Sequence, residues 1–148
     1  MDKSVLAGGA TVIAGGLVAL QPPINSLLGK SVGNFAAASV NFFVGLCLLT
    51  LITLVFANGF GDLGEARGLP WYYWVGGGCV GAAYVTTVLM TVRELGAGGV
   101  TAATITGQLA ASIAIDKAGV LGVPETPISA SRVVGVALLV AGTILVVR

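Results

Sequence analysis

Polar side chains inside long apolar stretches are the first candidates for chemistry in this sequence. In a membrane such groups are costly, and those that persist mark substrate or ion pathways. Gln21 and Asn25 lie four residues apart around Pro22-Pro23, and Asn41 adds a third amide in the next apolar stretch. Residues four apart share a helix face, and proline frees the backbone carbonyls of the preceding turn. We therefore expect a broken helix that presents amides to a substrate site.

A second set of polar residues follows later in the chain. Its members are separated by 3, 4, 4 and 4 residues and are Thr101, Thr104, Gln108, Ser112 and Asp116. These spacings place all five on one helix face, and Thr106 falls off it. Such a face either lines a water-filled pathway or joins helices through hydrogen bonds worth about 0.6 kcal/mol each. Both interpretations stay open for the hydroxyl residues, whereas the amide of Gln108 favours a functional role.

Asp116 is the only acidic residue placed within an expected span. Burial near lipid favours the neutral form of a carboxyl, which would suit a proton-coupling site. The alternative is an aspartate near the helix end, exposed to headgroup water. Lys117 follows directly but points about 100° away on a helix. The position of Asp116, a few residues before the expected end, slightly favours the alternative.

The sequence offers few residues or motifs for catalysis or metal binding. Histidine, the commonest general base and metal ligand, is absent, and no HExxH, GxSxG or P-loop motif occurs. Cys47 and Cys79 lie in apolar runs without a CxxC partner, so we interpret them as small buried hydrophobic residues. The charged residues are scattered, with a net charge of +1 and no basic patch for nucleic acid. We predict no enzymatic activity, no metal, no cofactor and no nucleic-acid partner.

The amino-acid composition indicates which kind of secondary structure carries these residues. The 148 residues are 56% hydrophobic and 9% charged, against about 25% charged in soluble domains. Lipid as the outer solvent removes the need for a polar surface, and the 23 glycines let membrane helices approach closely. A membrane barrel strand would alternate apolar and polar residues, which segments such as 46–56 do not. We predict one all-α integral membrane domain over residues 1–148, with the lipid bilayer as its surroundings.

Each membrane span needs about 20 mostly apolar residues. We predict five transmembrane helices, over residues 4–28, 34–57, 71–92, 99–121 and 129–147. The first stays apolar without a cleavage site, so we expect a retained span rather than a signal peptide. Short links are expected at 29–33 and 93–98, and a longer loop at 58–70. The aromatic cluster 71–74 fits an anchor at the headgroups better than a ligand site.

Charge bias bears on orientation. With five spans, one side holds Lys3, Arg67, Lys117 and Arg132, and the other holds Lys30, Arg93 and Arg148. An excess of Lys and Arg in short loops marks the cytoplasmic side, and a difference of one residue gives almost no preference for either orientation. We therefore expect insertion both ways and an antiparallel homodimer, which reproduces the inverted repeat of many transporters. The alternative is one-way insertion set by other means.

Two motifs carry a resemblance to a known family. They are LQPPINSLLG at residues 20–29 and GQLAAS at 107–112, the second followed by Ile115-Asp116 and Gly119. With Tyr84 in the third span, they make the chain resemble the YdcZ-type family of the drug/metabolite transporter superfamily along its whole length.

The resemblance implies a five-span transporter of the bacterial inner membrane. It implies dual-topology single chains, paired chains of opposite orientation or ten-span fusions, and it adds Tyr84 to the pathway candidates. The related small multidrug resistance transporters use a glutamate in the first span. This chain has Gln21 and Asn25 there, which weighs against a proton/cation antiport of that kind.

The sequence therefore predicts a small-molecule transporter that works by alternating access as an antiparallel homodimer. Its substrate would bind near Gln21, Asn25, Asn41 and Gln108 and be neutral or weakly charged, because the spans lack counter-charges. A small dual-topology ion channel is the first alternative, since Asn41-Phe42-Phe43 is similar to segments of fluoride channels, although those have four spans. A membrane subunit that transports nothing is the second.

Overall fold

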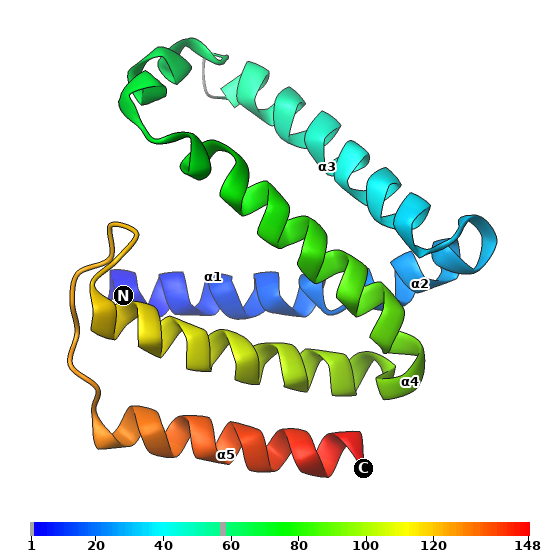
Figure 1. The fold of residues 1–148 in the computed structure, drawn as a ribbon, viewed down its shortest axis with the longest axis vertical. Helices are drawn as coiled ribbons and strands as arrows, with labels where there is room; N and C mark the ends of the chain where they lie inside the picture. Colours follow the sequence, from blue (N-terminus) through cyan, green and yellow to red (C-terminus); the bar gives the residue numbers. More distant parts are fainter. Residues whose placement is uncertain (1, 57–58) are drawn as a thin grey trace. The chain divides into compact units, whose positions relative to one another are not determined.

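A computed structural model describes residues 2–56 and 59–148 (Figure 1). Its elements are α1 (Lys3–Val18), α2 (Gln21–Val32), α3 (Asn34–Phe56), the 3₁₀ helix η1 (Gly61–Gly68), α4 (Trp71–Ala118) and α5 (Ala130–Val147). No strand occurs in the described ranges, which confirms the all-helical prediction. The chain divides into two compact units, Met1–Met90 and Thr91–Arg148, and each is described by itself.

Four helical stretches of the described chain are long and apolar enough to cross a membrane. They are Lys3–Val32, Asn34–Phe56, Trp71–Ala118 and Ala130–Val147. Large apolar side chains cover their outer faces; Phe56 is 81% exposed and Leu145 is 77% exposed. In a bilayer these surfaces meet lipid rather than water, so their exposure has no hydrophobic cost.

The 48-residue α4 is not one straight helix. Gly96 has φ 69° and ψ 169°, a conformation that is essentially restricted to glycine. This residue divides α4 into an arm over residues 71–95 and an arm over residues 97–118. It lies inside the turn predicted over 93–98.

The first predicted span is interrupted, as its prolines led us to expect. Helix α1 starts with the Asp2 side chain accepting a hydrogen bond from the Ser4 amide at 3.3 Å, and it ends at Val18. The break falls at Ala19-Leu20, because Pro22 and Pro23 cannot donate to the turn before them. Both prolines then lie in the first turn of α2, where a missing N–H costs nothing.

The link predicted over 29–33 is wrong in extent. Helix α2 continues to Val32, and only Gly33 interrupts the backbone before α3 begins at Asn34. Gly33 has φ 87° and ψ 154°, and its N–H still bonds the Gly29 carbonyl at 3.0 Å. A single residue can turn the chain here because glycine adopts positive φ without steric cost. The predicted end of the second span, residue 57, lies outside the described residues.

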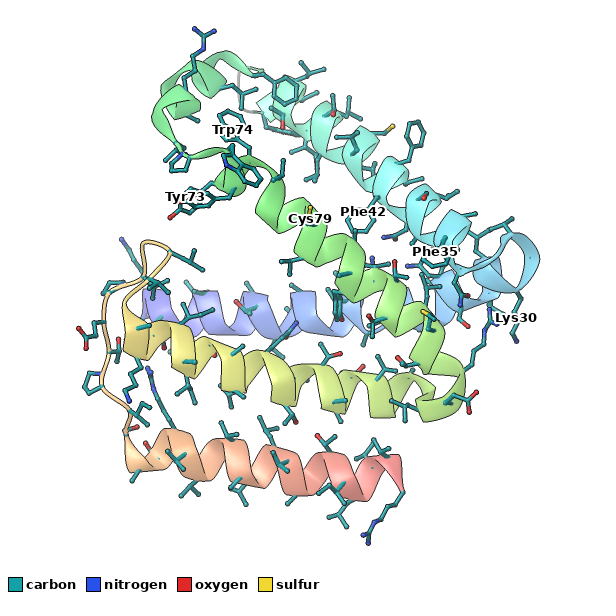
Figure 2. All side chains as sticks on the ribbon, in the orientation of Figure 1. Lys30, Phe35, Phe42, Tyr73, Trp74 and Cys79 are labelled. Carbon is teal, nitrogen blue, oxygen red and sulfur yellow. The ribbon has the colours of Figure 1, made fainter. Side chains whose placement is uncertain are left out.

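The core of the first unit lies where α3 meets the first arm of α4. It consists of Ala37, Ala38, Val85 and Leu89, with Leu28 and Tyr84 packed against it. The two alanines of α3 let α4 approach closely, because small side chains permit short interhelical distances. Figure 2 shows Phe42 of α3 pointing toward α4, where its ring would lie 3.4 Å from a Cβ added at Gly81.

The second unit is a helical hairpin in which the second arm of α4 and α5 run side by side (Figure 1). The arm ends at Ala118 rather than at the predicted residue 121, because Gly119 takes φ 59° and breaks the helix. The connecting loop is held by the Thr126 amide, which donates to the Asp116 carbonyl at 2.8 Å. Ser129 caps the N-terminus of α5 by accepting from the Arg132 amide at 3.3 Å.

Candidate functional site

The helix break brings two of the predicted site residues together. Gln21 is the first residue of α2, and its Nε2 donates to Oδ1 of Asn41 on α3 at 3.1 Å. Both side chains are half-buried. The bond joins residues 20 positions apart and uses one donor and one acceptor of the amide pair. The Gln21 carbonyl oxygen and the Asn41 amino group stay available for a ligand.

Asn25 lies one helical turn beyond Gln21 and is only 7% exposed. Its side chain forms no hydrogen bond with any group that the structure describes. Throughout the same part of the chain, no fully enclosed side-chain nitrogen or oxygen lacks a partner. The Asn25 amide atoms are therefore not fully enclosed. A largely buried amide whose hydrogen-bonding groups are not used by the protein is a binding-site candidate.

Tyr84, the fourth candidate in the first unit, has a different environment. It is half-buried and packs against the hydrophobic cluster formed by Ala37, Ala38, Val85 and Leu89. Packing against this cluster explains the position of the Tyr84 ring without a ligand. A role in the substrate pathway therefore remains a prediction for Tyr84.

Two hydroxyls of the polar stripe on the second arm of α4 are satisfied within their own helix. The Thr101 hydroxyl donates to the Ala97 carbonyl at 2.8 Å, and the Ser112 hydroxyl donates to the Leu109 carbonyl at 2.9 Å. Thr104 is half-buried, and Gln108 is exposed. Neither of these two bonds joins α4 to α5; the stripe residue that contacts α5 is Asp116.

The hydroxyl that does join the two helices is Thr106, which lies off the stripe. Its Oγ1 lies 2.7 Å from Oγ1 of Thr143 and 3.3 Å from the Leu139 carbonyl, and the Thr143 hydroxyl also donates to the Ala102 carbonyl at 3.0 Å. Residues 106 and 108 are about 200° apart around the helix. The face that carries Gln108 is therefore turned away from α5.

Sequence reasoning missed the interhelical role of Thr106, although a signal was present. Thr143 is the only polar side chain in the interior of the fifth apolar run. A lone hydroxyl in such a run satisfies its hydrogen bonds most readily against a polar residue of the neighbouring helix. Searching the adjacent helix for that partner would have identified Thr106.

Asp116 forms an ion pair that the sequence did not predict. Its Oδ2 accepts from Nη1 of Arg132 on α5 at 2.9 Å, and the side chains of Arg132 and Asp116 are 39% and 29% exposed. The pair lies at the loop end of the hairpin, beside the Thr126–Asp116 backbone bond. Asp116 therefore has a counter-charge within its own unit.

The whole sequence was also compared with known proteins. Residues 6–145 match the model of a family described as "Putative inner membrane exporter, YdcZ". The chain belongs to the YdcZ family. No curated protein and no solved structure matches it. Family membership confirms the resemblance carried by the segments 20–29 and 107–112, and it makes the chain an inner membrane protein of a transport family.

Two further features of this YdcZ-family chain bear on the sequence predictions. Cys47 and Cys79 are both exposed, so the expectation of buried cysteines is wrong. They lie on apolar helices whose outer faces meet lipid, which hydropathy alone does not distinguish from a protein core.

Tyr73 and Trp74, labelled in Figure 2, line a hollow of about 250 Å³ with Ala66 and Leu69.

The described side chains offer few ligands for a metal centre. Within the described ranges, no group of three or more His, Cys, Asp or Glu side chains gathers. The candidate site at the helix break instead offers neutral amides and backbone groups. These groups recognise a ligand by hydrogen bonds or by dipoles rather than by a full opposite charge.

Proposed function

We propose that this YdcZ-family protein moves a small molecule across the inner membrane by alternating access, as an antiparallel homodimer of five-pass subunits. The observation that carries the proposal is the broken first helix, where the buried Asn25 amide has no hydrogen-bond partner in the described chain. Discontinuous helices are where transporters commonly place their binding sites. Irregular backbone is tolerated at membrane depth only where protein or a water-filled cavity surrounds it.

The length of α4 supports the proposal of five passes. At 1.5 Å per residue a straight helix of 48 residues would extend about 72 Å, more than twice the hydrocarbon thickness of about 30 Å. Divided at Gly96, its arms are each about 30–40 Å long, which suits one crossing apiece. With α1–α2, α3 and α5, the subunit then crosses the membrane five times. The basic residues divide four to three between the two sides, which favours insertion in both orientations.

The proposed substrate is neutral or weakly charged. Helices α1, α2 and α3 contain no acidic residue, and the amides of Gln21, Asn25 and Asn41 lie at or beside the break. Amides offer donors and acceptors in fixed directions and therefore suit a molecule with both. On α4, the face that carries Thr101, Thr104, Gln108 and Ser112 is proposed as a further pathway surface, because α5 leaves it uncovered.

Substitution of the amides tests the site. Solutes that raise the melting temperature of the purified wild-type protein should lose this effect in Asn25→Ala and Asn41→Ala. Ser39→Ala is the matched control, because Ser39 lies on α3 and its hydroxyl bonds only the Phe35 carbonyl of its own helix, at 3.0 Å. Gln21→Ala and Gln108→Ala complete the set. A wild-type response in all four amide variants would place the site elsewhere.

Orientation is tested separately. A single reporter cysteine at Gly64, in a Cys47→Ala/Cys79→Ala background, is labelled with an impermeant thiol reagent before and after permeabilisation. Both native cysteines must be removed because both are exposed. Labelling of about half the molecules from outside supports dual insertion. Labelling from one side only contradicts the antiparallel homodimer and points to a partner chain of opposite orientation.

The ion-channel alternative has less support. Asn41 is engaged by Gln21, and the Phe42 ring lies against the backbone at Gly81, so both residues have packing roles within the subunit. A transporter gives saturable solute flux, whereas a channel gives unitary currents. Planar bilayer recordings of the purified protein distinguish the two.

A further inference from the structure

The corner between η1 and α4 contains a hollow that the amide site does not use. It has a volume of about 250 Å³ and is lined by Ala66, Leu69, Tyr73 and Trp74. The last turn of η1 is closed by the Leu69 amide, which donates to the Ala66 carbonyl at 2.9 Å, and the chain is extended at Leu69 before α4 begins. The small side chain of Ala66 leaves room beside the two aromatic rings of α4 that Figure 2 labels.

This hollow lies at a face of the membrane. Helix α3 before η1 and helix α4 after it are both long and apolar enough to cross a bilayer, so η1 connects two spans at the level of the headgroups. Tyrosine and tryptophan rings collect at this depth because one end of each ring is apolar and the other is polar. The molecule most available to fill the hollow is therefore a phospholipid of the surrounding bilayer.

The two rings that line the hollow have polar groups available for a ligand. Neither the Tyr73 hydroxyl nor the Trp74 indole N–H forms a hydrogen bond with a group that the structure describes. The Tyr72 ring packs against Trp71, with centroids 6.2 Å apart, and against Tyr73, at 4.8 Å. No ring of the described chain packs against Trp74. Trp74 therefore offers the hollow both an apolar wall and a hydrogen-bond donor.

We propose that the hollow binds one zwitterionic phospholipid, with an acyl chain against Tyr73 and Trp74 and the phosphate at Arg67. At about 250 Å³ the hollow is smaller than the roughly 300–1,000 Å³ of sites that bury a whole drug-sized ligand. It suits one segment of an extended molecule whose remainder stays in the bilayer. Arg67 is exposed and directly follows Ala66, which lines the hollow. The binding does not depend on the proposed transport function.

The charges of η1 favour a headgroup with both signs. The segment contains one basic residue, Arg67, and two acidic residues. Anionic lipids are selected by clusters of several Lys and Arg, which η1 does not have. Phosphatidylethanolamine carries a phosphate and an ammonium group, so its headgroup matches a segment of mixed charge better than an anionic headgroup does.

Tryptophan fluorescence reports on the hollow directly, because the sequence has only two tryptophans. Trp71→Phe leaves Trp74 as the sole emitter, and Trp74→Phe leaves Trp71, which is 75% exposed and does not line the hollow. The purified full chain in neutral detergent is titrated with phosphatidylethanolamine brominated in its acyl chains, which quenches on contact. We expect Trp74 emission to fall along a saturating curve that ends at one lipid per chain. Trp71 emission should fall only in proportion to the lipid content of the micelle, and the same unsaturated decline for both tryptophans would overturn the proposal.

Ala66→Leu, in the Trp71→Phe background, tests whether the hollow holds the lipid. The larger side chain fills the space, and we expect the half-quenching lipid concentration to rise about tenfold, which corresponds to about 1.4 kcal/mol of binding. Gly68→Ala is the matched control in the same turn, because a Cβ added at Gly68 meets no atom within 4 Å. A wild-type quenching curve in a folded Ala66→Leu variant would overturn the proposal.

Arg67→Gln tests the headgroup contact and covers the case in which Ala66→Leu does not fold. We expect the half-quenching concentration to rise about two- to fivefold, the range for an exposed ion pair. An unchanged value would overturn the phosphate contact, and tighter binding of brominated phosphatidylglycerol would overturn the zwitterionic assignment. Trp74 emission that no lipid quenches, but that shifts to shorter wavelength as the protein concentration rises, would show that a second copy fills the hollow instead.

Discussion

Removing the charge of Asp116 distinguishes a structural role of its carboxylate from a role in proton coupling. The carboxylate lies 2.9 Å from Nη1 of Arg132, and the pair joins the loop ends of α4 and α5. Asp116→Asn keeps the size of the side chain and removes its charge. The backbone bond from Thr126 to the Asp116 carbonyl does not involve the side chain, so the loop keeps its closure.

The exposure of the Asp116–Arg132 pair determines how large its coupling free energy should be. Exposed ion pairs contribute about 0.2–1 kcal/mol, whereas breaking a fully buried pair costs about 3–5 kcal/mol. The side chains are 39% and 29% exposed, so solvent or headgroups screen about a third of each and the pair belongs near the exposed class. We expect a coupling free energy of about 1 kcal/mol, or about 2–4 °C in melting temperature for a chain of this length.

A double-mutant cycle measures this coupling. Asp116→Asn, Arg132→Gln and the double variant are melted beside the wild type, and the double variant should be no less stable than either single variant. Lys117→Gln is the matched control, because Lys117 is adjacent to Asp116 but points about 100° away. A coupling near zero would refute the stabilising role of the pair. Transport that keeps its full pH dependence in Asp116→Asn would exclude the proton-coupling role.

Three further substitutions have expected outcomes. Gly96→Ala should destabilise the protein by about 1–3 kcal/mol in denaturant unfolding, because alanine cannot adopt φ 69° and ψ 169° without strain, whereas Gly98→Ala in regular helix should be tolerated. Thr106→Val and Thr143→Val should show a coupling of about 0.6 kcal/mol in a melting cycle, and additive effects would show that their bond does not stabilise the hairpin. Asn25→Leu should raise the melting temperature of the ligand-free protein while abolishing solute responses; a lower melting temperature would mean that the amide is already satisfied.

Hydropathy predicted the helices well but not where each one ends. Gly29 and Lys30 interrupt the apolar run, so the sequence suggested a link there, yet α2 passes through both. Hydropathy shows which residues prefer lipid, whereas a helix ends where its backbone hydrogen bonds end. That position is set by Gly33 after α2 and by Gly119 after α4, through positive φ values that composition does not encode.

The candidate site was predictable in part. The spacing of Gln21 and Asn25 around two prolines predicted a broken helix with an amide face, because both the spacing and the missing N–H groups are local properties. The Gln21–Asn41 bond and the Asp116–Arg132 pair join residues 20 and 16 positions apart on different helices. Such pairs depend on how helices pack, and no periodicity within one helix specifies them.

The two units use their polar groups differently, and this difference supports a functional site at the break. In the second unit Thr106 bonds Thr143 and Asp116 pairs with Arg132, so these groups stabilise the hairpin. In the first unit the Asn25 side chain is 7% exposed and has no hydrogen-bond partner in the described chain. Its amide atoms are not fully enclosed, because no fully enclosed side-chain nitrogen or oxygen of the described chain lacks a partner. The amide therefore adds no hydrogen bond to the packing of the first unit and can still meet water or a bound molecule, which favours a role in binding.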